Sequence, residues 1–216
     1  MGYALGSVGT AAFSTVPGLL LAYYLTNSLG VAAALAALVV LVPKLWDVVF
    51  LPLVGRLSDR SAQARRSRRP LLLAGGLTLP VLFVLMFAVP AGSAPAVAAL
   101  WVLIAFTLAA SAFAVFQVPY IAMPAEITDS TTERTTLMSW RVGFLAFGIL
   151  LCGVGAPALR DAAGYVAMAA GVGAVIAVGM LGCWWAMRRT RPVPADSVPV
   201  AHGGLRQQLS AAWRTR

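Results

Sequence analysis

The chain has 216 residues, of which 60% are hydrophobic and 11% are charged, with a formal net charge of +9 and a mean hydropathy of +0.86. Soluble domains contain about 25% charged residues, so this composition excludes a water-soluble fold. The sequence instead predicts an all-α membrane protein that uses the lipid bilayer as its solvent.

Six apolar segments are long enough to span a bilayer, and together they make up the predicted domain 1–190. We expect them over residues 2–29, 31–54, 69–89, 96–123, 137–159 and 163–187. Residues 191–216 follow as a second region, a stiff polar linker and an amphipathic helix on the inner membrane surface.

The basic residues lie almost entirely on one side of these six spans. Thirteen of the sixteen share that side, and RRSRR has no stacking or base-reading group beside it, so we expect no nucleic-acid partner. The thirteen are Arg56, Arg60, Arg65, Arg66, Arg68, Arg69, Arg134, Arg188, Arg189, Arg191, Arg206, Arg214 and Arg216. Because cytoplasmic loops carry the excess of Lys and Arg, we predict an integral protein of the cell membrane with both termini in the cytoplasm.

The first segment has one face of small, weakly polar residues. Close helix packing and the lining of a polar cavity both account for such a face. Its members are Gly2, Gly6, Gly9, Gly18, Ser7, Thr10, Ser14 and Thr15. Near the outer end of this segment, Tyr23 fits either an aromatic belt at the membrane interface or the wall of a binding site.

The second segment contains a lysine and an aspartate inside the predicted span. Lys44 and Asp47 are three positions apart, so they share a helix face and can pair with each other. A charge at the centre of the bilayer costs about 2.5 to 3.5 kcal/mol on insertion scales, so it is kept where it is paired or lies on a solute path. Two interpretations follow, a mutually neutralised pair or an Asp47 that lines the working cavity.

Two later segments add further polar candidates. Pro119 and Pro124 interrupt the backbone hydrogen bonding of the fourth segment. Such an interruption is tolerated where a neighbouring helix or a cavity satisfies the freed backbone groups. Gln117 is therefore a candidate cavity residue or an interhelical hydrogen-bonding partner. Arg141, near the start of the fifth, either faces a cavity or reaches the inner headgroups. We find no pattern for a metal site or a nucleophile and base, so no enzyme activity and no cofactor are expected.

Several motifs resemble those of a known transporter family. GRLSDR followed by RRSRRP resembles the loop between the second and third helices of major facilitator transporters. KLWDVVFLP, QVPYIAMPAEIT and ERTTL, in this order, are similar to the glycoside–pentoside–hexuronide:cation symporter family of the melibiose-permease type. The resemblance implies half of a major facilitator fold, the amino-terminal six of twelve helices. It also implies that substrate and coupling cation bind at mid-membrane between two halves that rock.

Some functional residues of the family carry over by position and others do not. Asp47 matches the first acid of the family's W-D-x-x-x-D-P pattern, a cation-site residue with Lys44 beside it here, whereas Leu51 occupies the position of the second acid. Losing that carboxylate disfavours Na⁺, while coupling to H⁺ needs only one titratable group. Ala11 and Gln117 stand where the sugar-binding members of the family have acidic residues. A substrate other than a sugar is therefore also compatible with the sequence.

Two groups of site residues follow from the motifs and the resemblance. The predicted substrate cavity contains Gln117, Tyr120, Arg141 and Tyr23. The predicted conformational loops contain Gly55, Asp59, Arg60, Glu126 and Arg134. In the family, the aspartate corresponding to Asp59 meets the positive end of a helix in the other half, which this chain does not contain.

Three functions remain open from the sequence. The first is one half of a symporter that moves a small polar solute such as a sugar with a cation, together with a separate carboxy-terminal half or a second copy. The second is a truncated or accessory membrane protein without transport activity of its own. The third is a membrane module that recruits a soluble partner through its basic loop and tail.

Overall fold

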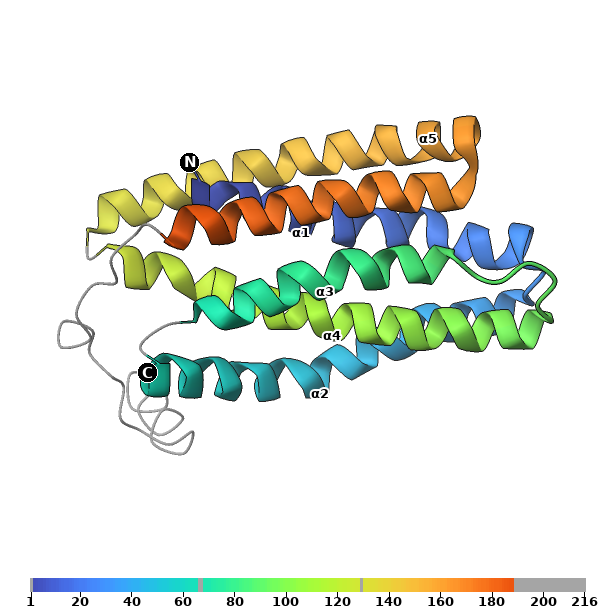
Figure 1. The fold of residues 1–216 in the computed structure, drawn as a ribbon, viewed down its shortest axis with the longest axis horizontal. Coiled ribbons are helices and arrows are strands. Elements are labelled where there is room, and N and C mark those ends of the chain that lie inside the picture. The colour runs from blue at the N-terminus through green and yellow to red at the C-terminus, as the bar shows by residue number, and fades with distance from the viewer. Residues whose placement is uncertain (1, 66–67, 129, 189–216) are drawn as a thin grey trace, which may run out of the picture.

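A computed structural model describes residues 2–65, 68–128 and 130–188, all within one helical bundle (Figure 1). The first predicted span is built from four short helical pieces and the later ones from long helices. In chain order the elements are η1 (Gly2–Ala4), α1 (Leu5–Val16), η2 (Pro17–Leu21), η3 (Tyr24–Ser28), α2 (Ala33–Arg65), α3 (Arg69–Phe87), α4 (Pro95–Ile127) and α5 (Thr131–Arg188). The predicted tail, residues 191–216, lies outside the described residues.

The fifth helix, α5, is two antiparallel arms joined at a glycine. Gly164 has φ 84°, ψ 176°, a non-helical conformation at which the chain folds back on itself (Figure 1). In the described part of the chain, five helices are long and apolar enough to cross a membrane, and the bend divides the last of them in two. The prediction of an all-α bundle with six spans is therefore confirmed.

Glycines with positive φ mark the turns at one end of the bundle. Gly30, Gly92 and Gly164 have φ of 64°, 80° and 84°, a region that a side chain with a Cβ rarely adopts. They lie between η3 and α2, between α3 and α4, and between the arms of α5. At the opposite end, α2 ends at Arg65 and α3 begins at Arg69, while α4 ends at Ile127 and α5 begins at Thr131.

The predicted loops at that opposite end are shorter than the sequence suggested. Gly55, Asp59 and Arg60 belong to α2, Glu126 belongs to α4 and Arg134 to α5, so none of the five residues assigned to conformational loops lies in a loop. Proline removes one backbone hydrogen bond but need not end a helix, and no further proline follows Pro52 within α2. The prediction that these residues lie in loops is wrong, while their conformational role stays a prediction.

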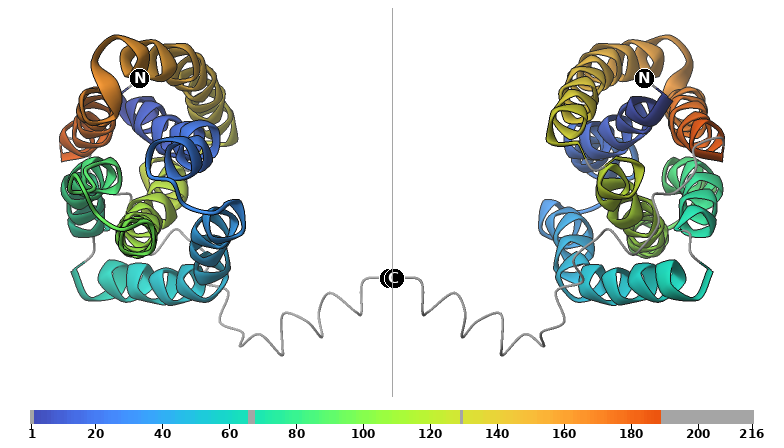
Figure 2. Two further views of the ribbon diagram at one scale, coloured as in Figure 1. Left: turned by 90° about the vertical axis from the view of Figure 1, so that its right-hand side faces the viewer. Right: turned by 90° about the vertical axis from the view of Figure 1, so that its left-hand side faces the viewer.

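Small residues allow α1 to pack closely against both arms of α5 (Figure 2). A Cβ built on Gly179 would lie 2.8 Å from the backbone nitrogen of Gly9, and one on Gly148 would lie 2.8 Å from the Cβ of Ala11. Lipid offers no hydrophobic drive for association, so helices in membranes rely on such close contacts. Close packing is therefore what Gly9 and Ala11 of α1 provide.

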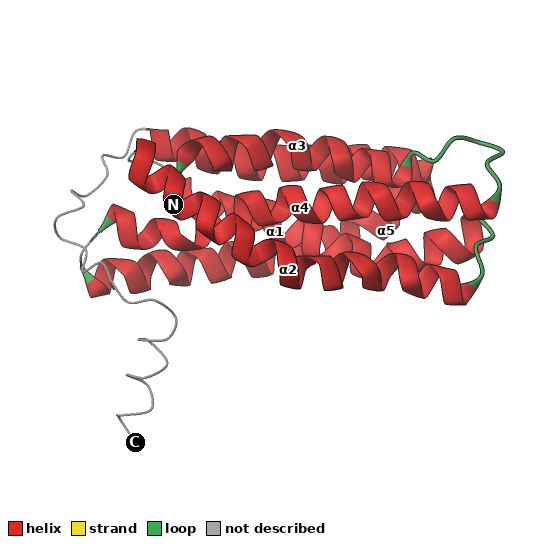
Figure 3. Cartoon of the chain, turned by 90° about the horizontal axis from the view of Figure 1, so that it is seen from below, coloured by secondary structure: helices red, strands yellow, loops and turns green. Residues whose placement is uncertain are grey.

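Helix α2 is the most exposed element of the bundle. Only 17% of its most hydrophobic window is buried inside the structure, against 72% for the first span. It lies along one edge and packs against α4 (Figures 2 and 3). Its outward side is apolar, with Leu45, Val48, Val49 and Leu53 each more than half exposed. This helix offers a surface for lipid or for a second bundle.

Candidate functional site

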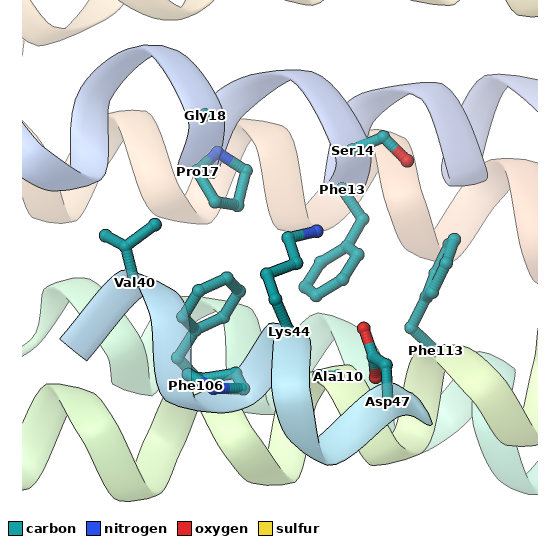
Figure 4. Close-up of a pocket in the computed structure, with 11 residues that line it drawn as sticks. Phe13, Ser14, Pro17, Gly18, Val40, Lys44, Asp47, Phe106, Ala110 and Phe113 are labelled. Atoms are coloured by element: carbon teal, nitrogen blue, oxygen red, sulfur yellow. The ribbon is translucent and has the colours of Figure 1, made fainter. Parts of the chain in front are cut away.

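A cavity of about 90 Å³ lies between α1, η2, α2 and α4, at mid-length of the bundle (Figure 4). Its walls are mainly apolar, and the polar groups that reach it come from three side chains. The lining residues are Phe13, Ser14, Pro17, Gly18, Val40, Pro43, Lys44, Asp47, Phe106, Ala110 and Phe113. Small-molecule sites have such a mostly apolar lining with few polar groups but volumes of about 300 to 1,000 Å³, so this hollow is at most part of one.

Lys44 and Asp47 both point from α2 into this cavity, with the lysine chain directed towards α1 (Figure 4). Lys44 is exposed and Asp47 is half-buried. The two groups influence each other electrostatically, yet among the described residues neither forms an ion pair within 4.0 Å. The cavity therefore contains both charges side by side without a closed salt bridge.

Residues of the small face of the first span take both predicted roles, the lining of a cavity and close helix packing. Ser14 and Gly18 line the cavity, whereas Gly6 and Gly9 pack against Tyr120 and Met180. The first two lie towards the carboxyl end of the first span and the last two towards its amino end. One end of the face thus serves packing and the other the cavity.

Aromatic rings close the cavity on the α1 and α4 sides. Phe13 stacks on Phe113 with ring centroids 4.8 Å apart and lies 6.3 Å from Phe106. The Trp46 indole donates a hydrogen bond of 2.9 Å to the Ser111 hydroxyl. That bond ties α2 to α4 beside the charged pair, so it helps to fix the direction in which α2 presents its charges.

Gln117 continues the cavity-facing side of α4. Ala110, Phe113, Gln117 and Tyr120 are separated by three, four and three positions, so they share one helix face. The first two line the cavity and the last two do not. The Oε1 atom of Gln117 is buried and has no hydrogen-bond partner in the structure. A buried amide oxygen of this kind is an open acceptor next to the cavity.

Tyr120 is fully buried and belongs to a hydrogen-bonded cluster with the start of the chain. Its ring stacks on Tyr3 at 4.6 Å, and its hydroxyl lies 2.7 Å from the Ser7 hydroxyl. The Arg141 guanidinium lies over the Tyr120 ring, 5.4 Å from its centroid, and donates to the sulfur of Met138 at 3.9 Å. Tyr120 and Arg141 are thus together, one turn or more beyond the cavity.

Tyr23 lies away from the other predicted substrate residues. It is 49% exposed, and the Arg160 guanidinium lies 5.3 Å from its ring centroid. Arg160 also bonds to Asp161, next to the Gly164 bend. None of the four predicted substrate residues lines the cavity, so their contact with substrate stays a prediction.

Asp59 has a cationic partner inside this bundle. Its Oδ1 atom lies 3.0 Å from Nη2 of Arg68, and Nη1 of the same arginine donates to the Ser58 hydroxyl at 3.2 Å. At the start of α5, the Arg134 Nε donates to the Thr128 carbonyl at 2.8 Å. The side chain of Glu126 lies outside what the structure describes. Both arginines therefore brace the ends of helices at this end of the bundle.

Sequence reasoning missed the aromatic and proline lining of the cavity. Phe13, Phe106 and Phe113 carry no motif, because apolar residues inside an apolar helix give no periodic signal of which side faces a hollow. The lining residues that the sequence did mark are Lys44 and Asp47, by their charge, and Ser14 and Gly18, by their small size. No group of three or more residues able to hold a metal ion occurs in the described ranges.

The long apolar helices of the bundle make this chain an integral membrane protein. Over residues 2–214 the chain matches the family described as MFS/sugar transport protein, and it belongs to that family. The resemblance seen in the motifs is thereby confirmed.

Named relatives agree with this membership. The chain is 33% identical over 158 residues to the Putative glycoside/cation symporter YagG of Escherichia coli K12, covering 73% of this chain and 34% of that protein. It is 27% identical over 151 residues to the Inner membrane symporter YicJ of the same strain, covering 70% and 33%. It is 26% identical over 210 residues to the Putative sulfoquinovose importer of Salmonella typhimurium LT2, covering 93% and 43%. The chain thus spans a third to two-fifths of these relatives' length.

Proposed function

We propose that this chain forms one half of a symporter that moves a sugar-like solute across the cell membrane with a coupled cation. The observation that carries the proposal is the cavity at mid-length of the bundle, where Lys44 and Asp47 face a hollow without forming a salt bridge. Intramembrane charges that face a cavity mark solute or ion paths. Relatives named as symporters and as a sugar importer support the same class.

Asp47 is the proposed cation-coupling group. Among the described residues it is the only carboxylate that lines the cavity, and Leu51 stands one turn further along α2. A metal cation such as Na⁺ prefers several oxygen ligands, and the described lining offers the Asp47 carboxylate and the Ser14 hydroxyl as side-chain oxygens. A proton needs a single carboxylate, so H⁺ is the proposed coupling ion.

The second half is proposed to cover the exposed side of α2. A rocking transporter holds its substrate between two bundles, and one bundle supplies only one wall of the site. The exposed apolar length of α2, next to the cavity, suits contact with a separate carboxy-terminal half or with a second copy of this chain.

The test is uptake by the assembled protein in proteoliposomes. The chain is co-purified with its second half, and accumulation of radiolabelled glycosides is followed under an imposed proton gradient or an imposed sodium gradient. We expect the proton gradient to drive accumulation and a protonophore to abolish it. Accumulation driven by sodium alone would overturn the proton assignment, and no accumulation under either gradient would overturn symport.

A further inference from the structure

One end of the bundle, which the basic residues predict to be cytoplasmic, carries more positive than negative charge (Figure 1). The described carboxylates at this end are Asp59, which pairs with Arg68, and Glu133, which accepts a hydrogen bond from the Thr128 hydroxyl. Both are thus engaged within the bundle. The described arginine side chains at the same end are Arg56, Arg60, Arg68, Arg69, Arg134 and Arg188.

Two of these arginines meet where α3 begins and α5 ends. Arg69 is the first residue of α3 and Arg188 the last of α5, and Nη1 of Arg69 donates to the Arg188 backbone carbonyl at 3.4 Å. Further along, the two helices lie side by side, and a Cβ built on Gly76 would lie 3.4 Å from Cδ2 of Leu181 (Figure 2). We call this line of contact, from Arg69 and Arg188 to Gly76 and Leu181, the α3–α5 seam. The packing of two helices thus brings two cationic residues to one end of the seam.

Two tryptophans accompany Arg188 at the end of α5. The Arg188 guanidinium lies 4.9 Å from the ring centroid of Trp184, and Trp185 is 53% exposed. Tryptophan is enriched at the membrane–water interface, where its ring sits at the level of the lipid headgroups. The Arg188 side chain is itself exposed, so its charge is available to a headgroup at that depth.

Apolar side chains continue the outward side of both helices from this charged end. Leu77 and Val81 of α3 and Val178 of α5 are each more than half exposed. Val178 and Trp185 are seven positions apart, about two turns, so they share one side of α5. A phospholipid has the same order of groups, a charged headgroup followed by acyl chains. The seam belongs to other helices than α2, the helix proposed to meet the second half.

We propose that the α3–α5 seam binds an anionic phospholipid, whose phosphate is held by Arg69 and Arg188. A guanidinium binds phosphate through two parallel hydrogen bonds, and basic sites between membrane helices on the cytoplasmic side bind anionic headgroups. A lipid of net negative charge is favoured over a zwitterionic one because positive charge is in surplus among the described side chains of this end. The acyl chains lie along the exposed apolar sides of α3 and α5.

The bound lipid ties the start of α3 to the end of α5, two points far apart in the sequence. A ligand that binds only the folded bundle stabilises it by mass action, so the anionic lipid strengthens the contact between these helices. This role concerns a surface outside the cavity and is measured without transport, so it does not depend on the proposed symport.

Native mass spectrometry of the full chain, with its second half where the two copurify, tests the inference. The protein is released from detergent micelles after titration with dioleoyl phosphatidylglycerol or with dioleoyl phosphatidylcholine, which has the same acyl chains and no net charge. We expect phosphatidylglycerol to bind about tenfold more tightly, which is what a hydrogen bond between charged groups is worth in affinity. Equal affinity for the two lipids would overturn the inference.

Three variants locate the site. Arg69→Gln and Arg188→Gln should each lower the affinity for phosphatidylglycerol about tenfold and leave the affinity for phosphatidylcholine unchanged. Arg56→Gln is the matched control, because it removes the same charge from an exposed position of α2 at the same end of the bundle. An equal loss in Arg56→Gln and Arg188→Gln would show diffuse attraction to a positive surface and would overturn the site.

Two further observations keep the test decisive. Arg69→Gln also loses the bond to the Arg188 carbonyl, whereas Arg188→Gln removes none of the hydrogen bonds that the structure describes, so the second variant decides if the first fails to fold. Soluble glycerol 3-phosphate, at the concentration of the lipid, should not displace phosphatidylglycerol because it has no acyl chains. Displacement would show that the arginines bind phosphate alone and would overturn the lipid as the occupant.

Discussion

The Tyr3 hydroxyl donates a hydrogen bond of 3.0 Å to the backbone carbonyl of Tyr120, and the residue four positions beyond Tyr120 is Pro124. In an α-helix this carbonyl would accept from the N–H of the fourth residue on, which proline lacks. The tyrosine at the start of the chain thus supplies the donor that proline removes from α4. The Tyr120 hydroxyl returns a bond of 3.1 Å to the Tyr3 carbonyl, so the contact is reciprocal.

Tyr3→Phe is expected to destabilise the bundle by about 1 kcal/mol, because it leaves the buried Tyr120 carbonyl without its donor while the stacked ring is kept. Thermal unfolding in detergent micelles measures the change. Tyr23→Phe is the control, since Tyr23 is half exposed and the ring that faces Arg160 is retained. Equal stability of the two variants would show that the Tyr3 bond contributes nothing.

Gly179→Ala tests the close contact between α1 and α5. The added Cβ would lie 2.8 Å from the backbone nitrogen of Gly9, and backbone cannot move aside as a side chain does. We expect a loss of about 1 to 3 kcal/mol in unfolding free energy, the usual effect of overpacking. Gly155→Ala, on the same helix with nothing within 4 Å of its Cβ, should be neutral or slightly stabilising. A stable Gly179→Ala variant would contradict the packing described here.

The Asp59–Arg68 ion pair is expected to add little to stability. The Asp59 side chain is 63% exposed, and exposed pairs contribute about 0 to 1 kcal/mol. Asp59→Asn should therefore unfold within about 1 kcal/mol of the natural protein, as measured by thermal unfolding. Its effect on uptake should be larger if this residue also meets the other half. A strong loss of stability would instead make the pair a structural element of this bundle.

Gln117→Leu separates a structural role from a role in binding. The Oε1 atom of Gln117 is buried without a partner, so replacing the amide by an apolar group of similar size should be neutral or stabilising. If Gln117 contacts the solute, the same variant should raise KM for uptake. Unfolding temperature and uptake kinetics are measured on one preparation. A clear loss of stability would show that the amide is satisfied in the protein.

Much of the fold follows from the sequence because membrane spans are read from length and hydropathy. The start of α3 at Arg69 follows from the charged residues before it. The turns near residues 30, 92 and 164 follow from the residues that end the spans on either side. The carboxyl end of α2 could not be placed in the same way. Gly55 and Pro52 read as helix breakers, yet a single glycine or proline weakens a helix without having to end it, and α2 continues to Arg65.

The site was predictable mainly where it is charged. Lys44 and Asp47 stand out in an apolar segment, because charge in a membrane is rare, and the structure places both in one cavity. Tyr120 shows the opposite case, since its motif position gives no sign that Tyr3 and Ser7 would bury its hydroxyl. Contacts between the first and fourth helices depend on tertiary packing, which the local sequence does not encode.

Asp47→Asn in the assembled protein tests the central claim most directly. The amide keeps the size of the side chain but cannot take up a proton or hold a cation by charge. Accumulation of glycoside under a proton gradient should be lost, because solute movement is no longer tied to the gradient. Exchange of labelled for unlabelled solute at equal concentrations should persist, which shows that the protein is folded and binds. Gradient-driven accumulation equal to that of the natural protein would show that Asp47 does not couple.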